Sequence, residues 1–270
     1  MEPKRFRRWR IWRGKQNKTI AATWVRIRDG PLRQHELLLA PESPALWNRE
    51  MLEGRYDSFL YDALAQSGVK IEAATIWDVG AHIGYHSLCF ASLVGPSGRV
   101  AAFEPNPYNS DRFQQNLERN PDLAQRISLF QFALSDTDGE EMFRFSTEVD
   151  NGKSSGSHLQ QAITPENAKA YRSFAETHVR TFRADTLKNE CQAPAPSVMK
   201  IDVEGAEFSV LKGSSGLLSS EKPILFIEIH NISMMFNVQR FLYRFGYELS
   251  MFRTEHDSIS RGFFLARPQR

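Results

Sequence analysis

Cysteine is scarce in this chain, whose 270 residues contain only Cys89 and Cys191. Two cysteines provide neither a disulfide framework nor a zinc-ligand spacing, so a small disulfide-stabilised fold and a zinc domain are both excluded. This usage fits a reducing, cytoplasmic environment. Cys89 lies in an apolar helical stretch and is expected to be a core residue.

Long apolar runs are also missing. No stretch approaches the roughly 20 residues that span a bilayer, and the basic start of the chain is not followed by the apolar segment of a secretory signal. With 41% hydrophobic and 24% charged residues, the composition is that of an ordinary globular protein. The length suits one sheet with helices on both faces.

The chain has no large net charge, but its charge is unevenly distributed. The total is +2, whereas residues 1–18 carry eight Lys and Arg against one Glu, so the remaining residues sum to −5. A domain that binds nucleic acid through an overall positive charge is therefore excluded. Contact with a polyanion or a membrane surface would have to come through residues 4–18, where Trp9 and Trp12 stand among the cations. We divide the chain into a basic N-terminal arm at 1–40 and one domain at 41–270, with a helical lead-in at 41–70 and a core at 71–270.

Strands and helices alternate from Ala73 onward. Nearly continuous apolar runs predict strands at Thr75–Val79, Arg99–Phe103, Ile127–Leu134, Val198–Ile201 and Ile224–Ile229. Helices are predicted at Tyr85–Val94, from Pro107 to Leu117 behind an Asn106 N-cap, at Ala206–Leu218, and around Val238 and Leu242. Repeated strand–helix units imply a Rossmann-like α/β fold with a mostly parallel sheet.

The later part of the chain departs from this pattern in two places. Glu141–Phe145 and Val179–Ala184 alternate like small antiparallel strands, and the polar segment at 151–161 between them suits a mobile lid. Tyr247–Phe252 and Gly262–Ala266 predict a C-terminal antiparallel hairpin.

Ligands bind such sheets outside the carboxyl ends of the strands. The first predicted strand ends in DVGAHIG, which places Asp78, Gly80, His82 and Gly84 around a strand-to-helix turn. Glu104 ends the second strand, where a carboxylate is placed to accept both hydroxyls of a ribose. Asp78 would repel the pyrophosphate of NAD but suits a cationic, amino-bearing ligand such as S-adenosylmethionine.

Acidic residues and a histidine end the fourth and fifth strands. The candidate catalytic residues are Asp202, Glu204, Glu228 and His230. His230 is the natural base for a hydroxyl because its unperturbed pKa lies near neutrality. Asp202 and Glu204 could instead clamp acceptor hydroxyls or, with Glu228, hold a divalent cation. Because the spacing defines no coordination geometry, we assign no metal ligand.

Five of these stretches together resemble the FkbM family of methyltransferases. They are DVGAHIGYHS, GRVAAFEPNP, ALSD, KIDVEGAEFSVLKG and FIEIHN, and the resemblance runs from about Trp47 to His230. It implies a class I methyltransferase fold, donor contacts from Asp78, Gly80, Gly84 and Glu104, and O-methylation of a sugar or natural-product hydroxyl. His82 stands where the family often has Asn or another polar residue, so its ring is expected to touch the donor. We add Asp136 of ALSD to the cofactor-binding set.

The acceptor hydroxyl remains open, since a small molecule, a glycan and a glycolipid all fit. Two other functions also stay open. One is an RNA-directed or other polyanion-directed protein that uses the basic arm, and the other is an NAD-dependent enzyme.

Overall fold

The structure is a computed structural model that describes residues 22–40, 46–145, 157–159, 175–189, 193–230, 232–252 and 262–269. The cations of the basic arm at 4–18 lie outside the described residues. So does the predicted lid at 151–161, apart from residues 157–159.

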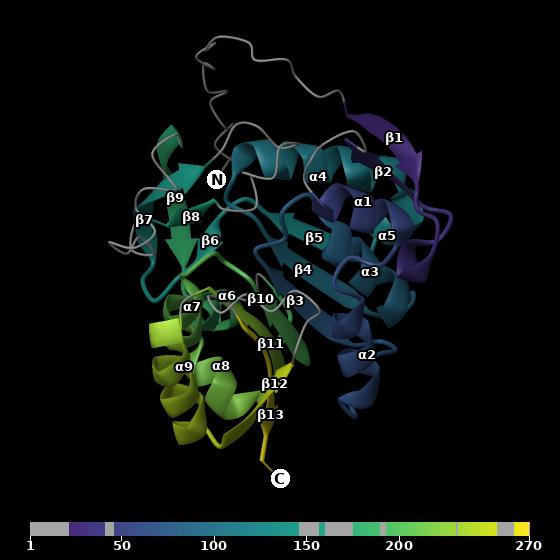
Figure 1. Cartoon of the computed structure of the whole chain (residues 1–270). Helices are drawn as coiled ribbons and strands as arrows, with labels where there is room; N and C mark the ends of the chain where they lie inside the picture. The colour runs from purple at the N-terminus through teal and green to yellow at the C-terminus, as the bar shows by residue number, and fades with distance from the viewer. Residues whose placement is uncertain are drawn as a thin grey trace.

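A seven-stranded mixed sheet occupies the centre of the molecule (Figure 1), with the order β12-β13-β11-β10-β3-β4-β5. Neighbouring strands from β11 to β5 are parallel, whereas β13 is antiparallel to both β11 and β12. The strands are β3 (Thr75–Val79), β4 (Arg99–Phe103), β5 (Ile127–Phe130), β10 (Val198–Ile201), β11 (Ile224–Ile229), β12 (Tyr247–Phe252) and β13 (Gly262–Pro268). The predicted Rossmann-like sheet with its C-terminal antiparallel hairpin is confirmed.

The strand order reverses beside β3. The chain moves outward from β3 to β4 and β5, and then returns to place β10 on the other side of β3. Ligands of open α/β sheets bind at such a switch point, outside the carboxyl ends of the strands. The topology therefore predicts a ligand site at the carboxyl ends of β3, β4, β10 and β11.

Successive residues of the central strands serve two separate cores, one on each face of the sheet. In β3, Ile76 belongs to the core that also contains Cys89 of α3 (Tyr85–Val94), whereas Trp77 and Val79 belong to the core that contains Leu242 of α9 (Ile232–Arg244). This alternation follows from the two-residue period of a strand. Cys89 is completely buried, as predicted.

Helices cover both faces of the sheet (Figure 1). They are α3 (Tyr85–Val94), α4 (Pro107–Arg119), α5 (Pro121–Ala124), α6 (Ala184–Asn189), α7 (Glu207–Gly213), α8 (Ser215–Ser220) and α9 (Ile232–Arg244). Asn106 caps α4 as predicted, because its side chain accepts a hydrogen bond from the Tyr108 amide at 3.0 Å. No helix among the described residues is long and apolar enough to cross a membrane.

The predicted helix Ala206–Leu218 is two helices, α7 and α8. Ser214 interrupts it with a backbone ψ of 11°. The first amides of α8 then bond to Asp185, since Gly216 and Leu217 donate to its two carboxylate oxygens at 2.9 and 2.8 Å. Asp185 thus caps the start of α8 from a distant segment, and the sequence around Ser214 does not indicate this second helix start.

The predicted strand Ile127–Leu134 is also divided. β5 ends at Phe130 because its neighbour β4 ends at Phe103, the register partner of Phe130. The chain then enters a second, four-stranded sheet of order β6-β9-β7-β8. Its strands are β6 (Ala133–Leu134), β7 (Gly139–Phe145), β8 (His158–Leu159) and β9 (Ala175–Phe182). The predicted antiparallel pairing is present between β7 and β9.

The domain begins earlier than the sequence suggested. β1 (Thr23–Arg26) and β2 (Glu36–Leu39) form a hairpin, with the short 3-10 helix η1 (Gly30–Leu32) between them. Leu32, Leu37 and Leu39 are completely buried. The Leu38 amide donates to Asn116 of α4 at 2.8 Å. Residues 22–40, which we assigned to the arm, are therefore part of the domain.

The predicted helical lead-in is present as α1 (Leu46–Glu53) and α2 (Ser58–Gln66). The break between them contains Gly54, at a φ of +73°, and Asp57, at a φ of +47°. A Cβ at Gly54 would lie 2.0 Å from the Asp29 carbonyl oxygen, so only glycine fits at this position.

Candidate active site

A cavity of about 1030 Å³ opens where the carboxyl ends of the parallel strands meet the lead-in helices. The volume is at the upper end of the range for small-molecule sites. Its sequence-predicted lining residues are Gly80, His82, Glu104, Asp202, Glu204 and Glu228. The fold thus gathers residues from four strand ends that lie up to 148 positions apart around one space.

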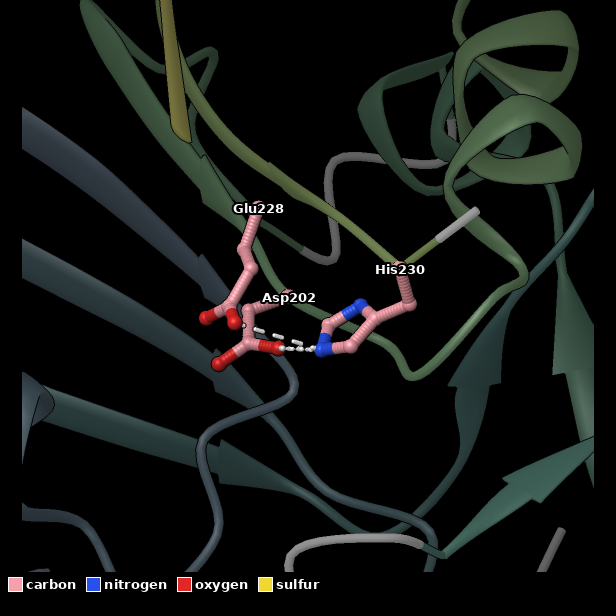
Figure 2. A group of neighbouring side chains, drawn as sticks. All are labelled: Asp202, Glu228 and His230. Atoms are coloured by element: carbon pink, nitrogen blue, oxygen red, sulfur yellow. Dashed lines mark ion pairs between the residues drawn. The ribbon is translucent and has the colours of Figure 1, made fainter. Parts of the chain in front are cut away.

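One wall holds a cluster of Asp202, Glu228 and His230 at the ends of β10 and β11 (Figure 2). His230 Nε2 lies 3.7 Å from Asp202 Oδ1 and 3.4 Å from Glu228 Oε1. Asp202 and Glu228 line the cavity, whereas His230 lies behind them and does not. The sequence placed all three together correctly but did not show which of them face the ligand space.

Two further carboxylates contact the same imidazole. Glu207, completely buried at the start of α7, lies 2.9 Å from His230 Nδ1, and Glu204 lies 3.5 Å from Nε2. Burial alone would lower the pKa of His230, but the Glu204 charge and the bond to Glu207 raise it well above its usual value. The neighbouring carboxylates therefore move the titration of His230 away from the near-neutral pH expected from its unperturbed pKa.

Glu204 has an unusual backbone and an unusual environment. Its φ of +54° lies in the left-handed region, which is strained for a residue with a side chain. Burial raises the pKa of its carboxyl to about 8, against the opposing effect of His230. A strained residue that lines the cavity is a candidate for direct contact with an acceptor.

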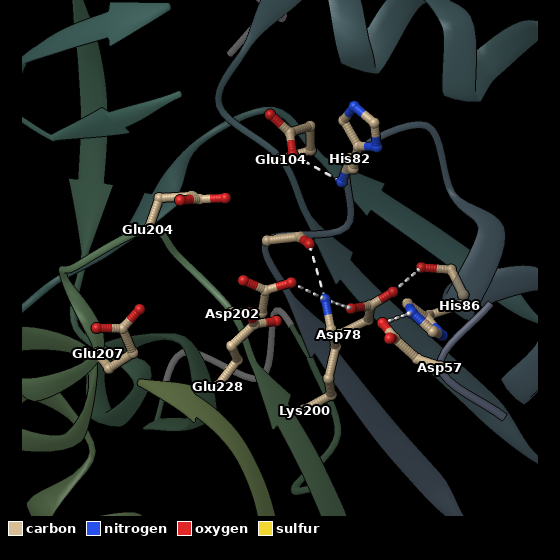
Figure 3. A network of polar contacts seen from close by, with 12 residues as sticks. Asp57, Asp78, His82, His86, Glu104, Lys200, Asp202, Glu204, Glu207 and Glu228 are labelled. Carbon is tan, nitrogen blue, oxygen red and sulfur yellow. Dashed lines mark hydrogen bonds and ion pairs between the residues drawn. The ribbon is translucent and has the colours of Figure 1, made fainter. Parts of the chain in front are cut away.

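Lys200 connects the two sides of the switch point (Figure 3). Its ammonium lies 3.4 Å from Asp78 and 3.3 Å from Asp202, and it donates to the Gly80 carbonyl at 3.1 Å. Burial would lower the Lys200 pKa, but Asp202 and Asp78 more than offset this and raise it. We did not single out Lys200, although a lysine within the apolar strand VMKI was a usable signal.

Asp78 is completely buried and does not line the cavity. It accepts a hydrogen bond from Ser87 at 2.6 Å and pairs with Lys200. Any influence of Asp78 on a ligand would therefore pass through Lys200 and the Gly80 turn. Asp136 also lies outside the lining, and its carboxylate pairs with Lys212.

Glu104 also lines the cavity, at the end of β4 and apart from Asp202 and Glu228 (Figure 3). Its two oxygens accept backbone N–H bonds from His82 at 2.7 Å and Asn106 at 2.8 Å. Burial nevertheless raises the pKa of Glu104 to about 7. The fixed carboxylate retains lone pairs for further hydroxyl donors.

The His82 ring stands beside Glu104 and contacts Trp47 edge-on, with ring centroids 5.1 Å apart. Burial and the nearby Lys200 lower the His82 pKa to about 3, so its imidazole is neutral at ordinary pH. Trp47, Tyr56 and Asp57 of the lead-in segment also line the cavity. Sequence reasoning missed these three because nothing local indicates that α1 and α2 fold over the strand ends.

The glycines of the turn have structural reasons to be glycine. Gly80 has a φ of +85°, and a Cβ there would lie 1.8 Å from the Asp202 carbonyl oxygen. Gly84 has a φ of +87°, and a Cβ would lie 2.1 Å from the Phe113 ring. Gly84 does not line the cavity. At both positions another part of the protein lies too close for a Cβ.

Comparison with known proteins gives a family. Residues 78–249 match the family described as "Methyltransferase FkbM domain". In structure, the chain is similar to the methyltransferase FkbM of Methylobacillus flagellatus, with a TM-score of 0.53 at 18% identity, over 74% of this chain and 45% of that one. This likeness confirms the class I methyltransferase fold.

Two curated relatives match in sequence. The hexuronic acid methyltransferase AglP of Haloferax volcanii is 31% identical over 159 residues, which are 59% of this chain and 57% of AglP. The AMB antimetabolite synthetase AmbE of Pseudomonas aeruginosa is 27% identical over 198 residues, which are 64% of this chain and 9% of AmbE. The chain thus spans less than two thirds of the length of either relative.

Proposed function

This chain belongs to the FkbM methyltransferase family, and from that membership we propose that it transfers the methyl group of S-adenosylmethionine to a hydroxyl of a sugar-containing acceptor. The observation that carries the proposal is the cavity at the switch point, lined by Glu104 and by the acidic group of Asp202, Glu204 and Glu228. These two features suit the two substrates of such a reaction. Family membership also favours the methyl donor over the NAD alternative.

Glu104 supports donor binding. It is fixed by two backbone amides and faces the cavity, so its remaining lone pairs are available to ribose hydroxyls. The neutral His82 ring beside it offers an uncharged surface. S-adenosylmethionine supplies an electrophilic methyl group on a sulfonium, and the carboxylates of the acidic group suit that positive charge.

The acidic wall supports hydroxyl binding. Carboxylates accept hydrogen bonds from sugar hydroxyls, and Asp202, Glu204 and Glu228 all face the cavity. Alignment of the hydroxyl with the methyl group supplies much of the rate in such a displacement. As the new C–O bond forms and the S–C bond breaks, the hydroxyl proton passes to this cluster. His230 acts there through the cavity-facing carboxylates.

AglP suggests an acceptor class, since its printed name specifies hexuronic acid. We propose a hexuronic acid or a related sugar for this chain. Arg55, which is exposed and lines the cavity from the lead-in segment, provides a cation that a uronate carboxylate can pair with. Pairing there would keep the acceptor carboxylate away from the acidic wall.

The test is methyl transfer from a donor labelled in its methyl group to a panel of hexuronic acid glycosides, neutral glycosides and glycolipids. We expect label in an O-methyl ether of at least one sugar, identified by mass and NMR. Arg55→Ala should lower the preference for uronic acids over neutral sugars. Binding of S-adenosylhomocysteine without transfer to any hydroxyl acceptor would contradict the proposal.

A further inference from the structure

We propose that Asp202, Glu228 and His230 bind one divalent cation at the wall of the cavity. Figure 2 shows the two carboxylates and the imidazole Nε2 converging from the ends of β10 and β11. One ligand atom from each residue lies within 4.8 Å of the others. Carboxylate oxygen and imidazole nitrogen form a donor set that suits Mn²⁺ and other small divalent cations.

The distances leave room for a cation at small cost. Two ligand atoms at right angles about a cation, each about 2.1 Å from it, lie about 3.0 Å apart. His230 Nε2 lies 3.4 Å from Glu228 Oε1 and 3.7 Å from Asp202 Oδ1. Carboxylate rotations that move each oxygen by less than about 1 Å would bring both oxygens to this separation from Nε2.

The orientation of the imidazole is a second, independent observation. His230 Nδ1 lies 2.9 Å from Glu207 Oε1, so Nδ1 donates to that carboxylate and Nε2 faces Asp202 and Glu228, where a cation would take the place of the Nε2 proton. Nε2 is enclosed, and the nearest acceptors that face it are the carboxylates of Glu228, Glu204 and Asp202 at 3.4, 3.5 and 3.7 Å. The completely buried Glu207 also accepts the Gly205 amide at 2.9 Å, so it is itself held in place. A buried carboxylate that fixes the far nitrogen is the arrangement found behind metal-bound histidines.

The charge balance of the cluster points the same way. Four carboxylates lie within 3.7 Å of the His230 ring nitrogens, from Asp202, Glu204, Glu207 and Glu228. Lys200 lies 3.3 Å from Asp202 and is shared with Asp78. Glu207 is completely buried and Glu228 is nine-tenths buried, so a divalent cation in the cluster would offset negative charge that is costly to bury.

The role of the cation rests on the proposed function, whereas its binding does not. Asp202 and Glu228 line the cavity, so a cation between them would face the acceptor. A hydroxyl bound to a divalent cation loses its proton more readily. The site would thus help position and activate the acceptor hydroxyl.

Binding is tested on the full chain with Mn²⁺, followed by the loss of the free-ion EPR signal. We expect one Mn²⁺ per chain, at least about tenfold weaker binding in Glu228→Gln and His230→Gln, and a similar loss in Glu207→Gln, which removes only the group that orients His230. Glu118→Gln, which removes one exposed carboxylate from α4, should bind as the wild type does. Mg²⁺ and Zn²⁺ are then compared by competition.

Two results would overturn the cation site. One is the absence of stoichiometric Mn²⁺ binding below about 1 mM, in which case a protonated His230 is itself the cation of the cluster. The other is binding that the Glu228 and His230 variants leave unchanged. Thermal melting and S-adenosylhomocysteine titration of each variant separate lost folding from lost metal. If Mn²⁺ binds but no hydroxyl is methylated, the proposed function fails and the cation site stands.

Discussion

Glu104 offers the sharpest test of donor binding, through the substitution Glu104→Gln. The wild-type carboxylate is fixed by the His82 and Asn106 amides and faces the cavity. Hydrogen bonds to a charged group contribute about 1.5–3 kcal/mol. Removal of the charge should therefore weaken S-adenosylhomocysteine binding by about tenfold to a hundredfold.

The same residue predicts a dependence on pH. Burial raises the pKa of Glu104 to about 7 in the free protein. Ribose hydroxyls donate to the ionised carboxylate, so donor affinity should be full above pH 7 and decline as pH falls through that value. Glutamine does not ionise there, so the variant should lose this part of the pH dependence.

Isothermal titration of both proteins with S-adenosylhomocysteine between about pH 5.5 and 8.5 measures both effects. The Gln side chain offers one oxygen in place of two, so one backbone amide loses its acceptor and melting temperatures must be compared first. Asp136→Asn is the matched control, because Asp136 was predicted at the donor site but does not line the cavity. Equal affinity in wild type and Glu104→Gln, or an unchanged pH profile, would refute the assignment.

Three further predictions concern the same region. His230→Ala removes the group that contacts the cavity-facing carboxylates, so it should lower kcat by about 10-fold to 100-fold while S-adenosylhomocysteine affinity stays nearly intact, and a variant with most of its activity would make the histidine structural. Lys200→Met leaves Asp78 buried without its cation, so denaturant unfolding should show a loss of about 3–5 kcal/mol, partly restored by adding Asp78→Asn. Gly80→Ala places a Cβ 1.8 Å from the Asp202 carbonyl and should lower the melting temperature more than Gly68→Ala, where a Cβ meets nothing within 4 Å although the φ is similarly positive.

Much of the central sheet could be predicted because its strands are short apolar runs bounded by polar residues. β3, β4, β10 and β11 have the predicted bounds. The division of Ile127–Leu134 could not be predicted, because it depends on where the neighbouring β4 ends and on β9, some forty residues later. The β1–β2 hairpin was missed for a similar reason, since its backbone is held by α4.

The candidate site could likewise be predicted only in part. The positions of Glu104, Asp202, Glu228 and His230 at strand ends follow from the sequence, because parallel strands that end in polar residues bring them to one edge of a sheet. Which of them face the cavity does not follow, since side-chain direction depends on the packing of each strand end.

The sequence by itself determined the fold class, the family and the edge of the sheet where polar residues gather, because these depend on local periodicity and on motif order. Only the tertiary structure showed which charged groups surround His230 and Asp78. His230 lies among four carboxylates that come from two separate strand ends and a helix start, and Asp78 lies behind Lys200 rather than in the cavity. Electrostatic interactions act through space over a few ångströms, and distances of that kind between residues far apart in the chain exist only in the folded protein.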